Sequence, residues 1–175
     1  METRITIRIA ESPADLTALG AIFREYAAYL QQHLGFQHIC MPTYEQEIAA
    51  LPGRYGPPDG ILLIALVDEA PAGCIAVQRV PDHHLLPGDA TAGELKRLYV
   101  RPEFRGHRLG HRLTEAALAF ARGHRYDALY LDTVPSRMTH ANANYAALGF
   151  LPAPRYNSNT DEGVCHFRLD LRQPV

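Results

Sequence analysis

Residues 94–118 read ELKRLYVRPEFRGHRLGHRLTEAAL, and the interpretation of the whole chain starts from this stretch. Residues 94–100 are typical of a strand, and the apolar periodicity that begins at Leu109 is typical of an amphipathic helix. Gly106 and Gly110 have no side chain, so a ligand can approach the connecting backbone closely. Because a first helical turn presents free N–H groups and the positive end of the helix dipole, the connection predicts an anion site.

Arg105 and Arg108 add positive charge to this connection, which therefore predicts a pyrophosphate cradle. The motif differs from a Walker A loop because no Gly-Lys-Ser/Thr follows. It differs from a dinucleotide fingerprint because the G-x-G-x-x-G spacing is absent. Many α/β domains have a glycine-bearing strand-to-helix connection, so the flanking segments decide between an anion site and a plain turn.

Two motifs resemble those of the GNAT superfamily, whose members move an acetyl group from acetyl-CoA to an amine. Segment 98–118 is similar to the acetyl-CoA motif R/Q-x-x-G-x-G/A, with Arg105 first, Gly110 last and Arg108 in place of the middle glycine. Segment 144–150, NYAALGF, is similar to the L-Y-x-x-L-G-F ending of the family, with asparagine in place of the first leucine. The two motifs occur in the family's order.

The resemblance is detailed over the C-terminal half and extends to the N-terminal half in the order of elements. Segments 131–136, LDTVPS, and 55–60, YGPPDG, also resemble a generic bacterial subgroup of the family. In the family, the strand before the loop splays from its neighbour and offers main-chain groups to the pantetheine arm of acetyl-CoA. The resemblance implies that the cofactor-binding residues are Leu98, Tyr99, Val100, Arg105, Gly106, His107, Arg108, Leu109, Gly110, His111, Asn142 and Tyr145.

Glu94 is the predicted general base, because several family members place a catalytic glutamate at the corresponding distance before the end of this strand. Strict strand alternation puts Glu94 on the same face as Leu98 and Val100, with its carboxylate in reach of the cleft. It would then deprotonate an ammonium directly or through water. The alternatives are a surface charge, an ion pair with Lys96 or Arg97, and a reaction in which water alone carries the proton.

Tyr145 is the predicted general acid, because it matches the tyrosine that points at the CoA sulfur in the family. An ordinary phenol has a pKa of about 10, so at neutral pH it is protonated and can donate to a departing thiolate. The alternative is a helix tyrosine that packs against Phe150. Asn142 and Asn144 lie within one turn of Tyr145, and one of them would hydrogen-bond the cofactor arm.

Candidates for the acceptor side are Asp132 and Thr133, at the end of the fifth predicted strand, and Tyr26, Tyr29 and His33, along one side of the first predicted helix. Each has a packing role as its alternative. The sequence leaves the acceptor open among a polyamine, an amino acid, an aminoglycoside, a xenobiotic and a protein terminus, because a fold resemblance does not define a substrate.

Four histidines fall in two polar segments. His107 and His111 share a helix face, but H-E-x-x-H is absent and no third ligand is in view, so we expect no metal. Both are interpreted as solvated positions beside phosphate, and His83 and His84 are expected to be exposed.

The chain has 175 residues, which indicates one domain over residues 1–175. A formal net charge of −2 gives no basic field that would attract nucleic acid, and no apolar run approaches the length of a membrane span. No secretory segment starts the sequence. Cys40, Cys74 and Cys165 form no C-x-x-C, which favours a reducing cytoplasm, and the latter two lie in apolar runs and are predicted to be buried.

The pattern predicts an α/β (α+β) fold with a mixed, mostly antiparallel sheet of six to seven strands flanked by about four helices. This arrangement agrees with the GNAT fold. The predicted strands cover residues 4–9, 61–67, 73–80, 91–100, 128–133, a short segment after 149–150, and 164–171, and the predicted helices cover 12–30, 44–51, 109–122 and 136–148.

The leading hypothesis is therefore an acetyl-CoA-dependent N-acetyltransferase in which the amine attacks directly in a ternary complex. No cysteine or serine accompanies a base in the motif region, so no covalent enzyme intermediate is expected. One alternative is a non-catalytic acyl-CoA-binding or regulatory module of the same fold, and another is a nucleotide-phosphate binder unrelated to acyl transfer. A homodimer is an expectation from the resemblance alone.

Overall fold

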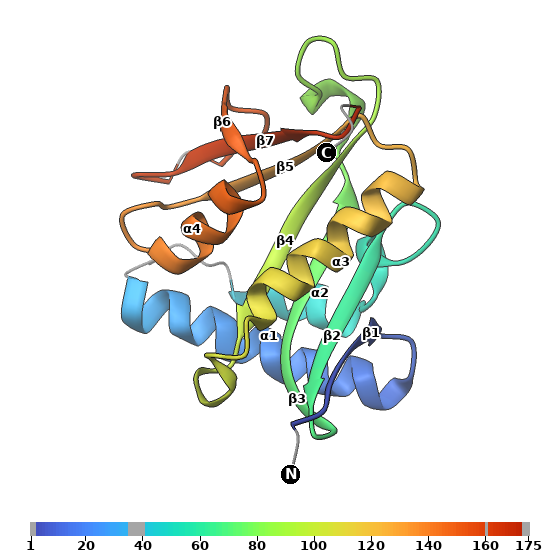
Figure 1. Cartoon of the computed structure of the whole chain (residues 1–175), viewed down its shortest axis with the longest axis vertical. Coiled ribbons are helices and arrows are strands. Elements are labelled where there is room, and N and C mark those ends of the chain that lie inside the picture. Colours follow the sequence, from blue (N-terminus) through green and yellow to red (C-terminus); the bar gives the residue numbers. More distant parts are fainter. Residues whose placement is uncertain (1–2, 35–40, 160, 173–175) are drawn as a thin grey trace.

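The fold is built on one mixed sheet, as the computed structural model shows for residues 3–34, 41–159 and 161–172 (Figure 1). The seven strands follow the order β1-β2-β3-β4-β5-β7-β6. The strands are β1 (Ile5–Ile9), β2 (Ile61–Val67), β3 (Ala70–Arg79), β4 (Ala92–Val100), β5 (Ala128–Thr133), β6 (Leu151–Ala153) and β7 (Cys165–Asp170). The helices are α1 (Pro13–Leu34), α2 (Met41–Ala49), α3 (Leu109–Gly123) and α4 (Thr139–Ala147). The predicted fold class is confirmed.

Strands β4 and β5 form the one parallel pair among the described strands, and they stay together only briefly. Their register joins Ala92 to Ala128, Gly93 to Leu129 and Glu94 to Tyr130, and no further pairs follow. Beyond that point the two strands diverge (Figure 1). The sheet therefore opens into a wedge in its middle, and the backbone of the second half of β4 is left without a partner on the β5 side.

A β-bulge in β4 changes which side chains face each layer. The two-residue step from Cys74 to Ala76 on β3 is opposed by the three-residue step from Tyr99 to Lys96 on β4, and Arg97 within it has a φ of 61°. An extra residue reverses the alternation beyond it. The prediction that Glu94 shares a face with Leu98 and Val100 was therefore wrong, because it assumed an unbroken strand.

Helices cover both faces of the sheet (Figure 1). On one face, α3 buries a stripe at helical spacing that includes Leu109, Leu113 and Ala117, and this stripe packs with Leu95 of β4. Leu98 and Val100 pack against the same cluster. The other face carries α1 and α2, whose buried residues pack with Tyr99 of β4 and with strands β2 and β3, through Leu19, Ile22, Phe23, Ala27 and Tyr44.

Several predicted boundaries needed correction. Strand β3 begins at Ala70 because the hairpin turns on only Asp68 and Glu69, both at positive φ as a two-residue hairpin requires. Helix α1 continues to Leu34, and α4 begins at Thr139, three residues later than predicted. The predicted burial holds for Cys74 but not for Cys165 on β7, whose side chain is exposed, and Cys40 lies outside the described residues.

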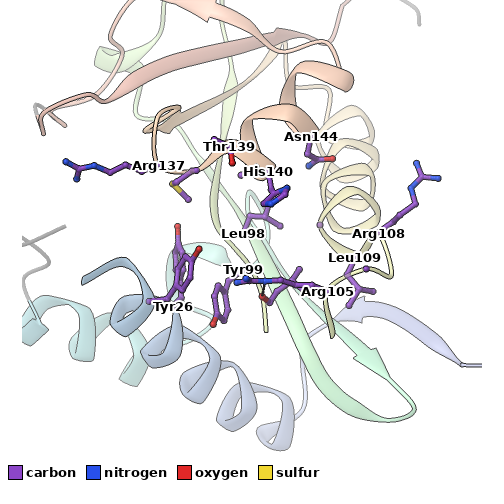
Figure 2. A pocket seen from close by; sticks show the side chains of 16 residues that line it. Tyr26, Leu98, Tyr99, Arg105, Arg108, Leu109, Arg137, Thr139, His140 and Asn144 are labelled. Atoms are coloured by element: carbon purple, nitrogen blue, oxygen red, sulfur yellow. Dashed lines mark hydrogen bonds between the residues drawn. The ribbon is translucent and has the colours of Figure 1, made fainter. Parts of the chain in front are cut away.

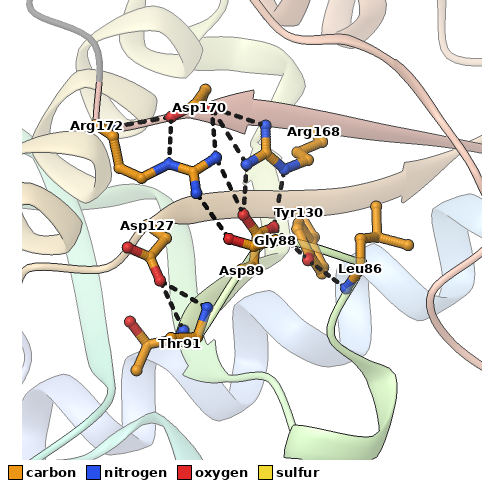
Figure 3. Close-up of polar contacts among 10 residues, drawn as sticks. Leu86, Gly88, Asp89, Thr91, Asp127, Tyr130, Arg168, Asp170 and Arg172 are labelled. Carbon is orange, nitrogen blue, oxygen red and sulfur yellow. Dashed lines mark hydrogen bonds and ion pairs between the residues drawn. The ribbon is translucent and has the colours of Figure 1, made fainter.

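A polar network connects the loop between β3 and β4 to side chains of β5 and β7 (Figure 3). The Asp89 side chain is only 1% exposed, and its carboxylate accepts hydrogen bonds from Arg168 of β7 at 2.5 and 2.9 Å and from the Tyr130 hydroxyl at 2.6 Å. Asp170 lies 3.3 Å from Arg168 and 2.7 Å from Arg172. Such paired carboxylates stabilise the fold only while they are ionised.

Asp89→Asn is expected to lower the free energy of unfolding near neutral pH. It should also make the free energy of unfolding depend less on pH in the acid range. Burial alone would raise the pKa of Asp89, but the hydrogen bonds from Arg168 and Tyr130 outweigh it and hold this pKa below the ordinary value. With a folded pKa below the unfolded value of about 3.9, the stabilisation is complete above that pH and is lost as the pH falls through the folded pKa.

Urea unfolding between pH 7 and pH 3 tests this prediction. The difference in free energy of unfolding between the wild type and Asp89→Asn should be constant at the upper end and shrink below about pH 4. A difference that stays constant down to pH 3 would refute it. Asp82→Asn is the control, because that side chain is 79% exposed and its removal should have little effect at any pH.

Candidate active site

A cavity of about 580 Å³ opens beside the divergent half of β4, between α1, the start of α3 and the start of α4 (Figure 2). Tyr26 rises from α1 on one side, while Thr139, His140 and Asn144 lie on the opposite wall. The cavity is lined by Tyr26, Tyr29, Leu98, Tyr99, Val100, Arg105, Gly106, Arg108, Leu109, Gly110, Arg137, Met138, Thr139, His140, Ala141 and Asn144.

The predicted cradle forms the end of this cavity next to α3. Arg108 precedes the first helical residue with φ 55°, the left-handed conformation that glycine adopts most easily, and Gly106 has φ 92°. An arginine in this conformation costs roughly 1–2 kcal/mol. A Cβ added to Gly110 would meet no atom within 4 Å, so its backbone faces open space. The turn thus has the left-handed backbone at Arg108 and Gly106 and open space beside Gly110.

The two arginines of the motif have different positions. The Arg105 guanidinium lies 5.4 Å from the centre of the Tyr29 ring, and its Nε donates to the Val100 carbonyl at 3.3 Å. Figure 2 shows Arg105 extending across the cavity and Arg108 extending away from it into solvent. Arg105 therefore brings its charge closer to a bound anion than Arg108 does.

Eight predicted cofactor-binding residues line the cavity, and four do not. Those that do are Leu98, Tyr99, Val100, Arg105, Gly106, Arg108, Leu109 and Gly110. His107 is exposed on the turn, whereas His111 Nδ1 lies 3.0 Å from Asn144 Oδ1. Asn142 donates to the Met138 carbonyl at 2.8 Å, so Asn144 and not Asn142 faces the cavity. The remaining residue, Tyr145, lines a second cavity.

The sequence reasoning missed the segment that enters α4. Arg137, Met138, Thr139, His140 and Ala141 all line the first cavity. The sequence indicates this segment only weakly, because its mixed composition is common in turns between a strand and a helix. The predicted start of a second helix was the one feature that could have pointed to it.

The second cavity, of about 210 Å³, lies in the wedge between β4 and β5. It shares Tyr26, Leu98 and Met138 with the first cavity, so the two meet at these side chains. It is lined by Tyr26, Leu30, Leu95, Lys96, Arg97, Leu98, Asp132, Thr133, Val134, Met138, Tyr145, Asn159, Asp161 and Val164.

Of the acceptor-side candidates, Asp132, Thr133 and Tyr26 line the second cavity, whereas Tyr29 lines only the first. The side chain of His33 lies outside the described part of the chain.

Tyr145 lines the second cavity from α4 and is 8% exposed. Its ring packs edge-on against Phe150 with 5.7 Å between the ring centres, so the packing alternative is also realised. Among the described residues, its hydroxyl has no hydrogen-bond partner. Burial, with a smaller contribution from the nearby Tyr26 and Asp132, raises the pKa of Tyr145 well above the ordinary phenol value. The hydroxyl therefore stays protonated and is available as a donor.

Glu94 is 5% exposed and lies behind Lys96 instead of in either cavity. Its carboxylate accepts hydrogen bonds from Gln78 at 2.5 Å, Tyr156 at 2.7 Å, Lys96 at 3.2 Å and Asn157 at 3.3 Å. The predicted ion pair with Lys96 is therefore present. The Glu94 carboxylate itself lines neither cavity, and its partner Lys96 lies between it and the second one.

Asp132, in contrast, borders the second cavity directly. Its side chain is 10% exposed, Oδ2 accepts a 2.5 Å hydrogen bond from Asn159, and Oδ1 lies 3.6 Å from Lys96 Nζ. Burial alone would raise the pKa of Asp132, but the charge of Lys96 and the hydrogen bond from Asn159 outweigh it and lower this pKa. Asp132 is therefore an anion at neutral pH.

Within residues 3–34, 41–159 and 161–172, no three His, Cys, Asp or Glu side chains are arranged to hold a metal ion. The helices described are all too short or too polar to cross a membrane.

The mixed sheet that opens between β4 and β5, with helices on both faces, is the fold that solved acetyltransferase structures share with this chain. The chain belongs to the Acetyltransferase (GNAT) family, whose family model matches residues 21–150. This result confirms the resemblance that was read from the two sequence motifs.

Known relatives and solved structures agree with this assignment. A Schizosaccharomyces pombe protein named as an uncharacterized N-acetyltransferase is 31% identical over 170 residues, which cover 97% of this chain and 96% of the relative. An acetyltransferase structure from Streptococcus agalactiae is 23% identical, with a TM-score of 0.73 and coverage of 95% and 98%. The PaiA N-acetyltransferase of Thermoplasma acidophilum, solved with coenzyme A, is 19% identical with a TM-score of 0.66 and coverage of 95% and 99%. The yeast relative extends the resemblance beyond bacteria.

Proposed function

We propose that this protein is an acetyl-CoA-dependent N-acetyltransferase that acetylates a primary amine of a small molecule or peptide. The observation that carries the proposal is that two cavities adjoin at the split of the sheet and share three lining residues. One cavity ends at the turn before α3, beside Gly110, and the Tyr145 side chain lines the other. The scattered, unpaired Cys74 and Cys165 support action in the cytoplasm.

The residues of the first cavity fit acetyl-CoA. The amides of residues 105–110 would hold the pyrophosphate at the start of α3, with Arg105 as its cationic partner. The β4 backbone at residues 98–100, which has no partner strand on the β5 side, would hold the pantetheine arm. The thioester would then lie near Tyr26, Leu98 and Met138, where the cavities meet.

In the proposed reaction the neutral amine attacks the thioester carbonyl, so that a C–N bond forms and the C–S bond breaks. Tyr145 donates its proton to the departing thiolate. The amine loses its proton to a base, and we retain Glu94 for this role. Because Glu94 lies behind Lys96, its contact with the amine runs through water or through the Lys96 side chain. No covalent enzyme intermediate is required.

The glycine Gly110 offers the sharpest test of cofactor binding. Gly110 and Gly123 both belong to α3, and a Cβ at either position would meet no protein atom within 4 Å. Alanine at either position should therefore leave the fold intact and stabilise the helix by roughly 0.5–1 kcal/mol. Only Gly110→Ala places a methyl group in the cavity, so it should weaken acetyl-CoA binding by at least about tenfold.

Thermal-shift titrations and calorimetry with acetyl-CoA measure this effect. Wild type and Gly123→Ala should be stabilised by about 2.7 kcal/mol at a hundredfold excess over Kd, while Gly110→Ala should need more ligand. An absence of any shift at millimolar acetyl-CoA would overturn the proposed function. Competition by ADP without competition by desulfo-CoA would instead point to a nucleotide-phosphate binder.

A further inference from the structure

The second cavity has a mixed lining, in which the polar share is the larger, and an acidic end. Its apolar part comes from Leu30, Leu95, Leu98, Val134 and Val164, and these side chains would contact a short alkyl chain. Its polar groups come mainly from β4, β5 and the segment that leads into β7. The lining therefore offers apolar contacts for a short alkyl chain beside polar groups for a charged head.

The charges at this end do not balance. Glu94 and Asp132 are two carboxylates that share a single ammonium, Lys96, which lies 3.2 Å from the first and 3.6 Å from the second. His166, which contacts Asn157, adds no charge at neutral pH, because burial lowers its pKa below the ordinary value. Lys96 cannot neutralise both carboxylates, so one negative charge remains at the cavity.

Among the described residues, the other cations near this end bind elsewhere or are exposed to solvent. The Arg97 guanidinium turns to the opposite layer, where it forms two hydrogen bonds with Glu47 at 2.8 and 2.9 Å. Arg155 is exposed, and the additional rim residue Asp161 is another acid. Hydrogen-bond acceptors are also in excess, since the Gln78 amide donates to Glu94 while its Oε1 is buried without a partner among the described residues.

The two carboxylates differ in what they can still bind. Glu94 already has four hydrogen-bond donors and is screened from the cavity by Lys96. Asp132 lines the cavity, and its Oδ1 is separated from Lys96 Nζ by more than a hydrogen-bond length. Asp132 Oδ1 is therefore the acceptor atom that an incoming ammonium would meet.

We propose that the acetyl acceptor is a small primary alkylamine without a neighbouring carboxylate, and that Asp132 is the residue that binds its ammonium group. The proposal rests on the proposed function, since it assigns the second cavity to the acceptor. A carboxylate beside the amine would lie near Asp132 and Asp161, and Lys96 is already shared between Asp132 and Glu94, so such acceptors are excluded by like-charge repulsion. Asp132 thus determines specificity in addition to binding.

The wild-type protein provides the first test, with saturating acetyl-CoA and thiol release as the readout. The probes are n-pentylamine, L-norleucine, which is the same amine with an added α-carboxylate, and L-norleucinamide, in which that group is uncharged. We expect kcat/KM for n-pentylamine to exceed that for L-norleucine by about 100-fold or more, with L-norleucinamide much closer to n-pentylamine. Equal or better use of L-norleucine would overturn the inference without any variant.

Asp132→Asn provides the second test. It should raise KM for n-pentylamine by about 10- to 100-fold, reduce the discrimination against L-norleucine, and leave the Kd of acetyl-CoA unchanged. Glu94→Gln should instead act mainly on kcat. Asp82→Asn removes one negative charge from an exposed position and serves as the control. An unchanged selectivity ratio in Asp132→Asn would refute the role of Asp132.

Different results would contradict the proposed function and the assignment of the acceptor. If acetyl-CoA does not bind, or if it binds and neither n-pentylamine nor any other amine releases thiol, the proposed function fails and the inference fails with it. If acetyl-CoA binds and carboxylate-bearing amines are the better acceptors, the proposed function stands and only the inference about the acceptor is wrong.

Discussion

Replacing Tyr145 by phenylalanine is expected to lower kcat by about 10²- to 10⁴-fold while leaving the Kd of acetyl-CoA unchanged. The hydroxyl that is removed has no hydrogen-bond partner among the described residues and opens onto the cavity in the split of the sheet. The ring keeps its packing against Phe150, so the fold should be unaffected. Without this donor, the thiolate would have to leave unprotonated.

Steady-state kinetics with n-pentylamine, together with calorimetric binding of acetyl-CoA, measure both quantities. Tyr26→Phe is the matched variant, because Tyr26 also lines the second cavity and burial raises its pKa to about 12. We expect the smaller loss of kcat for Tyr26→Phe. A Tyr145→Phe enzyme with wild-type kcat would remove Tyr145 from the mechanism, and tight cofactor binding without turnover in the wild type would favour the non-catalytic module.

Glu47→Ala is expected to reduce the free energy of unfolding by roughly 3–5 kcal/mol, because it leaves the Arg97 charge without its buried partner. The Glu47 and Arg97 side chains are 8% and 19% exposed. The guanidinium also lies 4.6 Å from the centre of the Tyr44 ring, and the Tyr55 hydroxyl donates to Glu47 at 2.9 Å. For a chain of this size, the loss corresponds to a fall in Tm of about 6–20 °C.

Urea unfolding and differential scanning calorimetry test this prediction. The control is Glu45→Ala on the same helix, whose ion pair with Arg24 is 44% and 52% exposed and should contribute little. Replacing both Glu47 and Arg97 by apolar residues of similar volume should recover much of the loss, because no unpaired charge remains. A Glu47→Ala variant as stable as Glu45→Ala would show that Arg97 finds adequate solvation without its partner.

The sequence predicted those features that depend on residues close together in the chain. The cradle at residues 105–110 is one, because the glycines and the following helix start set the backbone geometry locally. The ring contact between Tyr145 and Phe150, which belong to the same motif, is another such feature. The strands around the hairpin at Asp68 and Glu69 were also predictable, since β2 is an apolar run buried along its whole length.

Other features follow from contacts between segments that are distant in the sequence. The bulge at Arg97 depends on the register between β3 and β4 and on a partner, Glu47, that is 50 residues away. One extra residue there turns Glu94 away from Leu98 and Val100, and no local pattern encodes that reversal.

The position of Asp132 beside Lys96 also depends on the arrangement of strands that are distant in the sequence. Strands β4 and β5 pair over three residues and then separate, which leaves room between them for the cavity that Asp132 and Lys96 line. The chain by itself therefore determined the acetyltransferase family and the glycine-bearing turn before α3, because both depend on contiguous residues. Only the tertiary structure decided which carboxylate lines the second cavity, because that depends on strand register and on where two strands separate.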